Sequence, residues 1–75
     1  MEWQIKENKL YRRYNFKNYS EALSFVIKVS KLAEKINHHP DISFGWGYVE
    51  LYLYSHDKKT ITDRDHMLKD QISEL

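Results

Sequence analysis

The stretch NYSEALSFVIKVSKLAEKIN, residues 18–37, decides the fold, because its helical pattern is the clearest in the chain. Asn18 can cap a helix, and Glu21 follows three residues later in the capping-box position. Pro40 disfavours helical geometry at the residue before it, so the helix should end near Asn37 or His38. The apolar residues at helical spacing are Ala22, Phe25, Val26, Val29, Leu32, Ala33 and Ile36.

Beyond the proline the hydrophobic period changes to alternation, which predicts strands at residues 42–46 and 49–55. Gly47 and Tyr48 between them suit a two-residue type II′ turn, because glycine accepts a positive φ at the first central position. This register predicts that one face of the second strand meets the helix while the other is partly solvated. The first face carries Val49, Leu51 and Leu53, and the second carries Glu50, Tyr52 and Tyr54.

Before the helix, WQIKE at residues 3–7 and KLYRRYNF at residues 9–16 read as a hairpin with a turn at Asn8-Lys9. Leu10, Tyr14 and Phe16 should share one side of its second strand. After the last strand, Thr62 and Asp65 form another capping pattern, which opens a short helix with an apolar stripe at Leu68, Ile72 and Leu75.

The chain is therefore expected to be one α+β domain, residues 1–75, with the order β-β-α-β-β-α. A domain of this size has a thin core, and the chain has no cysteine for a disulfide, so self-association is the expected source of extra stability. The formal net charge of +1 argues against a nucleic-acid binder that relies on a basic field. No segment is apolar enough for a signal peptide or a membrane span, which favours a cytoplasmic protein.

Titratable side chains gather where the long helix ends. Glu34 and His38 are four residues apart, so the helical spacing predicts that they touch. The carboxylate and the partial negative charge of the helix C-terminus should both favour a protonated His38. His56 follows the last strand directly, so it could approach the corner formed by His38 and His39. Three histidines and one glutamate are expected to converge.

The spacing of these residues resembles the signature of the pterin-4a-carbinolamine dehydratases. The matching positions are Glu34, His38, His39, Pro40, Trp46, His56 and Asp65. The similarity also includes the opening tryptophan strand, the YNFKNY segment before the helix and the TDRD segment near the end, so it covers nearly the whole chain.

The resemblance implies a four-stranded antiparallel sheet with helices on one face, which agrees with the order read from periodicity. The family's usual N-terminal helix, ahead of the tryptophan strand, is missing from these residues. The implied activity is dehydration of a 4a-hydroxytetrahydropterin to a quinonoid dihydropterin in tetrahydropterin recycling. The pterin is then the substrate, and the reaction needs no metal and no organic cofactor. The expected assembly is a homodimer or a homotetramer.

The implied reaction needs one acid and one base, and histidine can serve as either near neutral pH. We expect His38, held by Glu34, to be the general acid and His56 to be the base, although the two histidines could exchange roles. His39 completes the catalytic set. The residues expected to bind the pterin are Asn37, His38, His39, Pro40, Trp46, Ser55 and His56. Many family members have aspartate where this chain has Asn37, but asparagine keeps the acceptor oxygen.

Parts of the sequence are also compatible with three other functions. The many aromatic residues could form a stacking platform for single-stranded nucleic acid, but the charge balance is poor for it. Histidine and glutamate could bind zinc, but adjacent histidines on an extended segment tend to point apart. The strongest alternative is a non-catalytic dimerisation or binding module, because some proteins of the resembling family act as dimerisation cofactors of a transcription factor. A pure scaffold would not need Glu34, His38 and His56 together.

Overall fold

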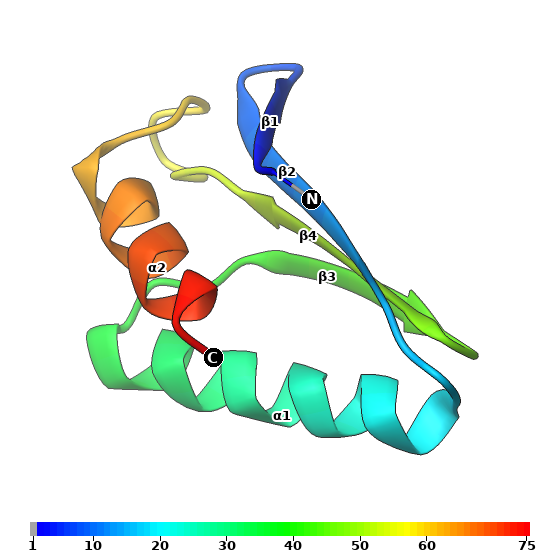
Figure 1. Cartoon of the computed structure of the whole chain (residues 1–75). Coiled ribbons are helices and arrows are strands. Elements are labelled where there is room, and N and C mark those ends of the chain that lie inside the picture. The colour runs from blue at the N-terminus through cyan, green and yellow to red at the C-terminus, as the bar shows by residue number, and fades with distance from the viewer. Residues whose placement is uncertain (1) are drawn as a thin grey trace.

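The computed structural model describes residues 2–75, which form one four-stranded antiparallel sheet and two helices. In chain order the elements are β1 (Gln4–Lys6), β2 (Lys9–Asn15), α1 (Tyr19–Ile36), β3 (Asp41–Gly45), β4 (Tyr48–Leu53) and α2 (Asp63–Ser73). The strands are ordered β1-β2-β4-β3, so β1 and β3 form the two edges. Figure 1 shows both helices on the same face of the sheet. The predicted α+β class and the order β-β-α-β-β-α are confirmed.

Helix α1 begins where the sequence predicts. The side-chain oxygen of Asn18 accepts a hydrogen bond from the N–H of Glu21 at 2.9 Å. The Glu21 carboxylate accepts in turn from the N–H of Lys17 at 3.0 Å, one residue before the position of the standard capping box. The Glu21 bond satisfies one backbone donor that the first turn of the helix leaves free, and the Lys17 bond fixes the segment that enters the helix.

The core lies between the sheet and the two helices. The face of β4 that was predicted to meet the helix is fully buried at Val49, Leu51 and Leu53, so the predicted inward face of this strand is confirmed. Residues from four of the six elements form this core. They are Leu10, Ala22, Val29, Val49, Leu51, Leu53, Leu68 and Ile72.

Both predicted turns are wrong by one residue. The first hairpin turns at Glu7 and Asn8, which have φ values of 53° and 63°, because a two-residue turn of type I′ requires positive φ at both positions. The second hairpin turns at Trp46 and Gly47. Gly47, with φ +82°, therefore takes the second central position, and a Cβ there would come within 3.1 Å of the Phe16 carbonyl oxygen.

The other corrections concern the end of the chain. Strand β4 ends at Leu53, and Ser55 forms only an isolated bridge with Thr60. Leu68 and Ile72 are buried on α2 as predicted, but Leu75 is 53% exposed because α2 has already ended at Ser73. Over residues 2–75, neither helix combines the length and the apolar composition that crossing a bilayer requires.

Because Leu51 is fully buried at the centre of the sheet, Leu51→Ala should lower the free energy of unfolding by about 2–5 kcal/mol. Chemical denaturation followed by circular dichroism measures this loss. The control is Ile5→Ala on β1, where the side chain is 69% exposed and little change is expected. Equal losses in the two variants would contradict the core described above.

Candidate active site

Helix α1 ends in a reversal of the backbone that directs His38 inward. Asn37 adopts a left-handed conformation, with φ 54° and ψ 44°. Its N–H donates to the Glu34 carbonyl at 3.3 Å, and the N–H of His38 donates to the Ala33 carbonyl at 3.1 Å. This pair of bonds is the Schellman motif, in which the chain turns back across the helix end. Asparagine suits the position because it tolerates left-handed geometry better than most residues.

His38 forms a buried hydrogen bond with Asp65 in the first turn of α2. The distance from His38 Nε2 to Asp65 Oδ1 is 2.6 Å. The His38 side chain is 7% exposed and that of Asp65 is 0% exposed, so water hardly competes for this bond. The contact joins the end of α1 to the start of α2, which lie close together in Figure 1.

Asp65 is also held by the segment before α2. Its Oδ2 atom accepts from the backbone N–H of Thr62 at 2.8 Å and from the Ser55 hydroxyl at 3.0 Å. Burial raises the pKa of Asp65, but the hydrogen bonds from His38, Thr62 and Ser55, with the charge of His38, outweigh burial and place that pKa below its ordinary value. Asp65 is therefore an ionised carboxylate at neutral pH.

The ionised carboxylate fixes the tautomer of His38. A carboxylate only accepts hydrogen bonds, so the Nε2 atom of His38 carries a proton and donates it to Asp65. The other ring nitrogen, Nδ1, is then the atom that can take up or release a proton. A histidine oriented by a buried carboxylate in this way is suited to acid–base chemistry.

The other two histidines of the predicted site each pair with their own carboxylate at the surface. His39 Nε2 bonds to Glu34 Oε2, and the side chains are 50% and 76% exposed. His56 Nε2 lies 3.3 Å from Asp41 Oδ1, and both side chains are 54% exposed. The ring of Tyr54 packs against His56 with a centroid distance of 4.3 Å.

The predicted contact between Glu34 and His38 is wrong. The prediction assumed that His38 continues the helix, where residues four apart share a face. The reversal at Asn37 takes His38 off that face and returns His39 to Glu34 instead. Among residues 2–75, no three side chains of His, Cys, Asp or Glu form a group that could hold a metal ion.

The remaining predicted residues are divided between the corner and a distant turn. Pro40 is half-buried and lies between His39 and β3. His56 contacts Asp41, the residue directly after Pro40, and this contact brings His56 to the same corner. Ser55 is 2% exposed, and its hydroxyl is committed to Asp65. Trp46 lies in the turn between β3 and β4, at the end of β3 opposite to Pro40, and is 73% exposed.

Three partners of the site were missed from the sequence. In the sequence Asp65 is both a helix cap and a signature position, and the combination of the two is the signal that could have marked it as the partner of His38. Arg64 Nη2 donates to the carbonyl of Asn37 at 2.8 Å and so reinforces the corner. Asp41 holds His56. Neither Arg64 nor Asp41 carries a local sequence signal, because their partners are 27 and 15 residues away.

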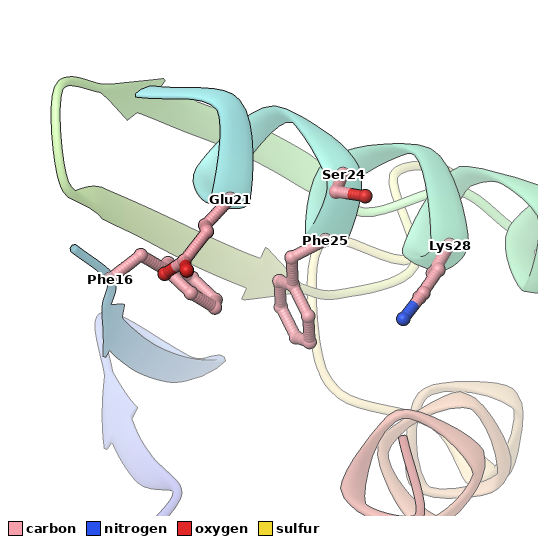
Figure 2. Close-up of a pocket in the computed structure, with 5 residues that line it drawn as sticks. All are labelled: Phe16, Glu21, Ser24, Phe25 and Lys28. Atoms are coloured by element: carbon pink, nitrogen blue, oxygen red, sulfur yellow. The ribbon is translucent and has the colours of Figure 1, made fainter. Parts of the chain in front are cut away.

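Figure 2 shows a pocket of about 360 Å³ that lies along α1 and includes none of the predicted site residues. Two phenylalanines from its lining also pack against the core, so much of its wall belongs to the hydrophobic core of the domain. The lining residues are Phe16, Glu21, Ser24, Phe25 and Lys28.

The fold and the corner together define a small α+β protein with paired histidines and carboxylates suited to proton transfer. The family model described as pterin 4 alpha carbinolamine dehydratase matches residues 1–75. The chain belongs to this family, as the resemblance indicated.

Relatives of the chain agree with this assignment. A protein of Rubrobacter xylanophilus, provisionally named a pterin-4-alpha-carbinolamine dehydratase, is 40% identical over 74 residues, which are 97% of this chain and 69% of the relative. A protein of Thermomicrobium roseum with the same provisional name is 42% identical over 73 residues, which are 97% of this chain and 78% of the relative.

Solved structures share the fold. A protein of Brucella melitensis described as a transcriptional coactivator/pterin dehydratase matches with a TM-score of 0.89 and 26% identity, over 96% of this chain and 79% of that one. A pterin dehydratase-like protein described as a RuBisCO assembly factor in the alpha-carboxysome matches with a TM-score of 0.73 and 24% identity, over 95% of this chain and 82% of that one. The second likeness shows the fold alone.

Asp65→Asn should destabilise the protein, because it weakens the bonds to His38, Thr62 and Ser55. The expected loss in the free energy of unfolding at neutral pH is about 1–3 kcal/mol. Since the pKa of Asp65 is lowered on folding, its ionisation stabilises the native state above the unfolded pKa, and this contribution disappears as the pH falls through the folded pKa. The difference between wild type and variant should therefore shrink in acid.

The control for this prediction is Asp63→Asn, in the same turn of α2 but exposed. Denaturation curves of all three proteins from pH ~7 down to pH ~2 test the prediction. It fails if the difference between wild type and Asp65→Asn stays constant over this range, or if Asp63→Asn behaves in the same way.

Proposed function

We propose that the protein dehydrates a 4a-hydroxytetrahydropterin to the quinonoid dihydropterin in tetrahydropterin recycling. The observation that carries the proposal is the buried bond between His38 and Asp65, which joins two positions of the family signature and leaves one histidine nitrogen free for proton transfer.

The proposed reaction breaks one carbon–oxygen bond and moves two protons. The hydroxyl on the 4a carbon receives a proton and leaves as water. The adjacent ring nitrogen loses its proton, and its electron pair forms the new double bond to the 4a carbon. Oxidation states are unchanged overall, so acid–base groups are sufficient for the chemistry.

In this proposal His38 protonates the leaving hydroxyl through Nδ1, while Asp65 offsets the positive charge on the ring. Asp65 is a positioning residue, and it replaces Glu34 in the role first predicted. His56 accepts the proton from the ring nitrogen and is held by Asp41. The two histidines could also exchange these roles.

The remaining residues would form the binding surface. His39, held by Glu34, and Pro40 would line the pterin ring. Asn37 would bond its polar edge, together with backbone groups near Ser55. The pterin would be substrate only, without a metal or an organic cofactor, and the protein would work in the cytoplasm.

His38→Gln should lower the rate of dehydration about 10²–10⁴-fold, because glutamine can still donate to Asp65 but cannot transfer a proton. The measurement is the disappearance of 4a-hydroxytetrahydropterin generated in situ, corrected for spontaneous dehydration. His66→Gln is the matched control, since His66 lies exposed on α2 and matches no signature position.

Two results would contradict this assignment. A wild-type rate equal to the spontaneous rate would overturn the proposed activity. A His38→Gln variant as active as wild type would remove His38 from the chemistry, and the same assay on His56→Gln would then show whether His56 acts alone.

Asn37→Gly tests whether the asparagine side chain contacts the substrate. Glycine is well suited to the left-handed cap, so the free energy of unfolding should not decrease. If Asn37 bonds the pterin, KM should rise while kcat changes little, because the bond forms in the ground state and in the transition state. An unchanged KM would exclude Asn37 from the binding surface.

A second candidate function rests on a different part of the surface. Tyr19, Leu23 and Ile27 are spaced four residues apart on α1 and are 40–49% exposed, which forms an apolar ridge suited to a protein partner. The Brucella melitensis structure with a coactivator description supports this binding role. Leu23→Asp would impair such binding and leave the dehydration rate unchanged, whereas His38→Gln would do the opposite.

A further inference from the structure

The face of the sheet that carries no helix holds a row of aromatic and basic side chains. Both helices pack on the other face, as Figure 1 shows. Because side chains alternate along a strand, Tyr52 and Tyr54 point away from the buried leucines of β4 and therefore away from the helices. The register of β2 and β4 places Tyr11 beside Tyr52 and continues to Lys9 beside Tyr54.

The contacts along this row begin at a histidine of the proposed site. The ring of Tyr54 lies 4.3 Å from the ring of His56, measured between centroids. The Nζ atom of Lys9 lies 4.6 Å from the centroid of the Tyr54 ring, which is a cation–π contact. Further along, the rings of Tyr52 and Tyr11 are 4.9 Å apart. We call the set beyond the histidine the tyrosine–lysine row, and its members are Tyr54, Lys9, Tyr52, Tyr11 and Lys6.

The positive charge of this row is not neutralised by the sheet. The four strands contain two acidic residues, Asp41 and Glu50, and each already has a partner. Asp41 contacts a histidine of the site, and the Glu50 carboxylate lies 3.6 Å from Nη1 of Arg13. In the part of the chain that the structure describes, neither Lys6 nor Lys9 forms an ion pair with a carboxylate. The two ammonium groups are therefore available to an anion.

The row borders the proposed site, because His56 contacts both Asp41 at the corner and Tyr54 in the row. A pterin bound at His56 would have the Tyr54 ring and the Lys9 ammonium next to it on the helix-free face of the sheet. An aromatic ring offers a surface on which a planar or apolar group can pack, and a half-buried ammonium attracts a negative charge that water screens only partly. These are the two properties of a site for an extended, anionic side chain.

We infer that the preferred substrate is a pterin whose side chain carries an anionic group, either a phosphate ester or a carboxylate. Lys9 binds this anion, and Tyr54 packs against the part of the side chain that links the anion to the ring. Lys6 lies further from His56 and contacts the anion of a longer side chain. This inference rests on the proposed function for the position of the pterin ring, and it adds the chemical class of the side chain.

The first test measures binding without any reaction. Three 7,8-dihydropterins serve as probes, because they lack the 4a hydroxyl and cannot be dehydrated. Dihydroneopterin has a neutral side chain, its 3′-phosphate carries a phosphate ester, and dihydrofolate carries carboxylates beyond an aromatic ring. Isothermal titration calorimetry gives the Kd of each. At low ionic strength at least one anionic probe should bind about three- to ten-fold more tightly than the neutral one, and added salt should reduce this gain.

The comparison of the two anionic probes identifies the group that is recognised. A gain for both assigns the preference to charge alone, whereas a gain for one of them assigns it to that anion. If both bind no more tightly than dihydroneopterin, the inference is wrong.

Lys9→Gln tests whether the gain depends on the row. This variant should bind the anionic and neutral probes with nearly equal Kd, and Lys9→Glu should bind the anionic probes more weakly than the neutral one. The control is Lys31→Gln, which makes the same change of charge at an exposed position of α1, on the other face of the sheet, and should keep the gain. Circular dichroism confirms that each variant is folded. A gain that persists in Lys9→Gln, or that disappears equally in Lys31→Gln, would overturn the role of the row.

The second test uses the reaction. The 4a-hydroxytetrahydro forms of the same three pterins are generated in situ, and the anionic side chain should lower KM with little change in kcat, because its contact is the same in the ground state and the transition state.

The two tests separate the two ways of failing. If wild type dehydrates the neutral pterin but neither binds nor converts the anionic ones better, the inference is wrong and the proposed function stands. If wild type accelerates none of the three reactions but binds an anionic probe with a gain that requires Lys9, the proposed function is wrong and recognition of the anionic side chain stands.

Discussion

The buried bond between His38 and Asp65 is the constraint on which the rest of the site depends. It joins the end of α1 to the start of α2, so the two helices cannot shift independently without breaking it. Asp65 also accepts hydrogen bonds from Thr62 and Ser55, which ties the loop after β4 to the same carboxylate. One ionised group thus organises three segments. Its ionisation serves the fold and the proposed chemistry together, because the charge that caps α2 also orients the imidazole of His38.

The backbone reversal at Asn37 explains why adjacent histidines have different environments. Successive residues of a helix would point 100° apart, but after the reversal His38 turns under the helix end and His39 stays at the surface. Burial separates the two rings further, since His38 is 7% exposed and His39 is 50% exposed. The pair His38-His39 therefore supplies one rigid, oriented group and one solvated group, which is a useful division in a site that must hold a ring and move protons.

Most of the fold could be predicted from the sequence, because periodicity and helix caps are local signals. The α1 boundaries, the buried face of β4 and the cap at Thr62 all follow from residues within a few positions of one another. Both hairpin turns were predicted one residue too late in the sequence. Glu7 is an unusual residue for a positive φ, and Gly47 can occupy either central position of a two-residue turn. The partners within the site were predicted less well. The link from His38 to Asp65 spans 27 residues, and the contact predicted in its place assumed that the helix continues past Asn37.

The tip of the β3–β4 hairpin is fixed to the rest of the sheet. The N–H of Phe16 donates to the carbonyl of Gly47 at 2.8 Å, and this bond anchors the turn to the end of β2. A loose loop that carries a large aromatic ring loses conformational entropy whenever the ring is covered, and this loss weakens binding. Here the backbone part of that entropy has already been lost during folding. The backbone that carries Trp46 is thus preorganised, so covering the exposed indole costs side-chain entropy but little backbone entropy.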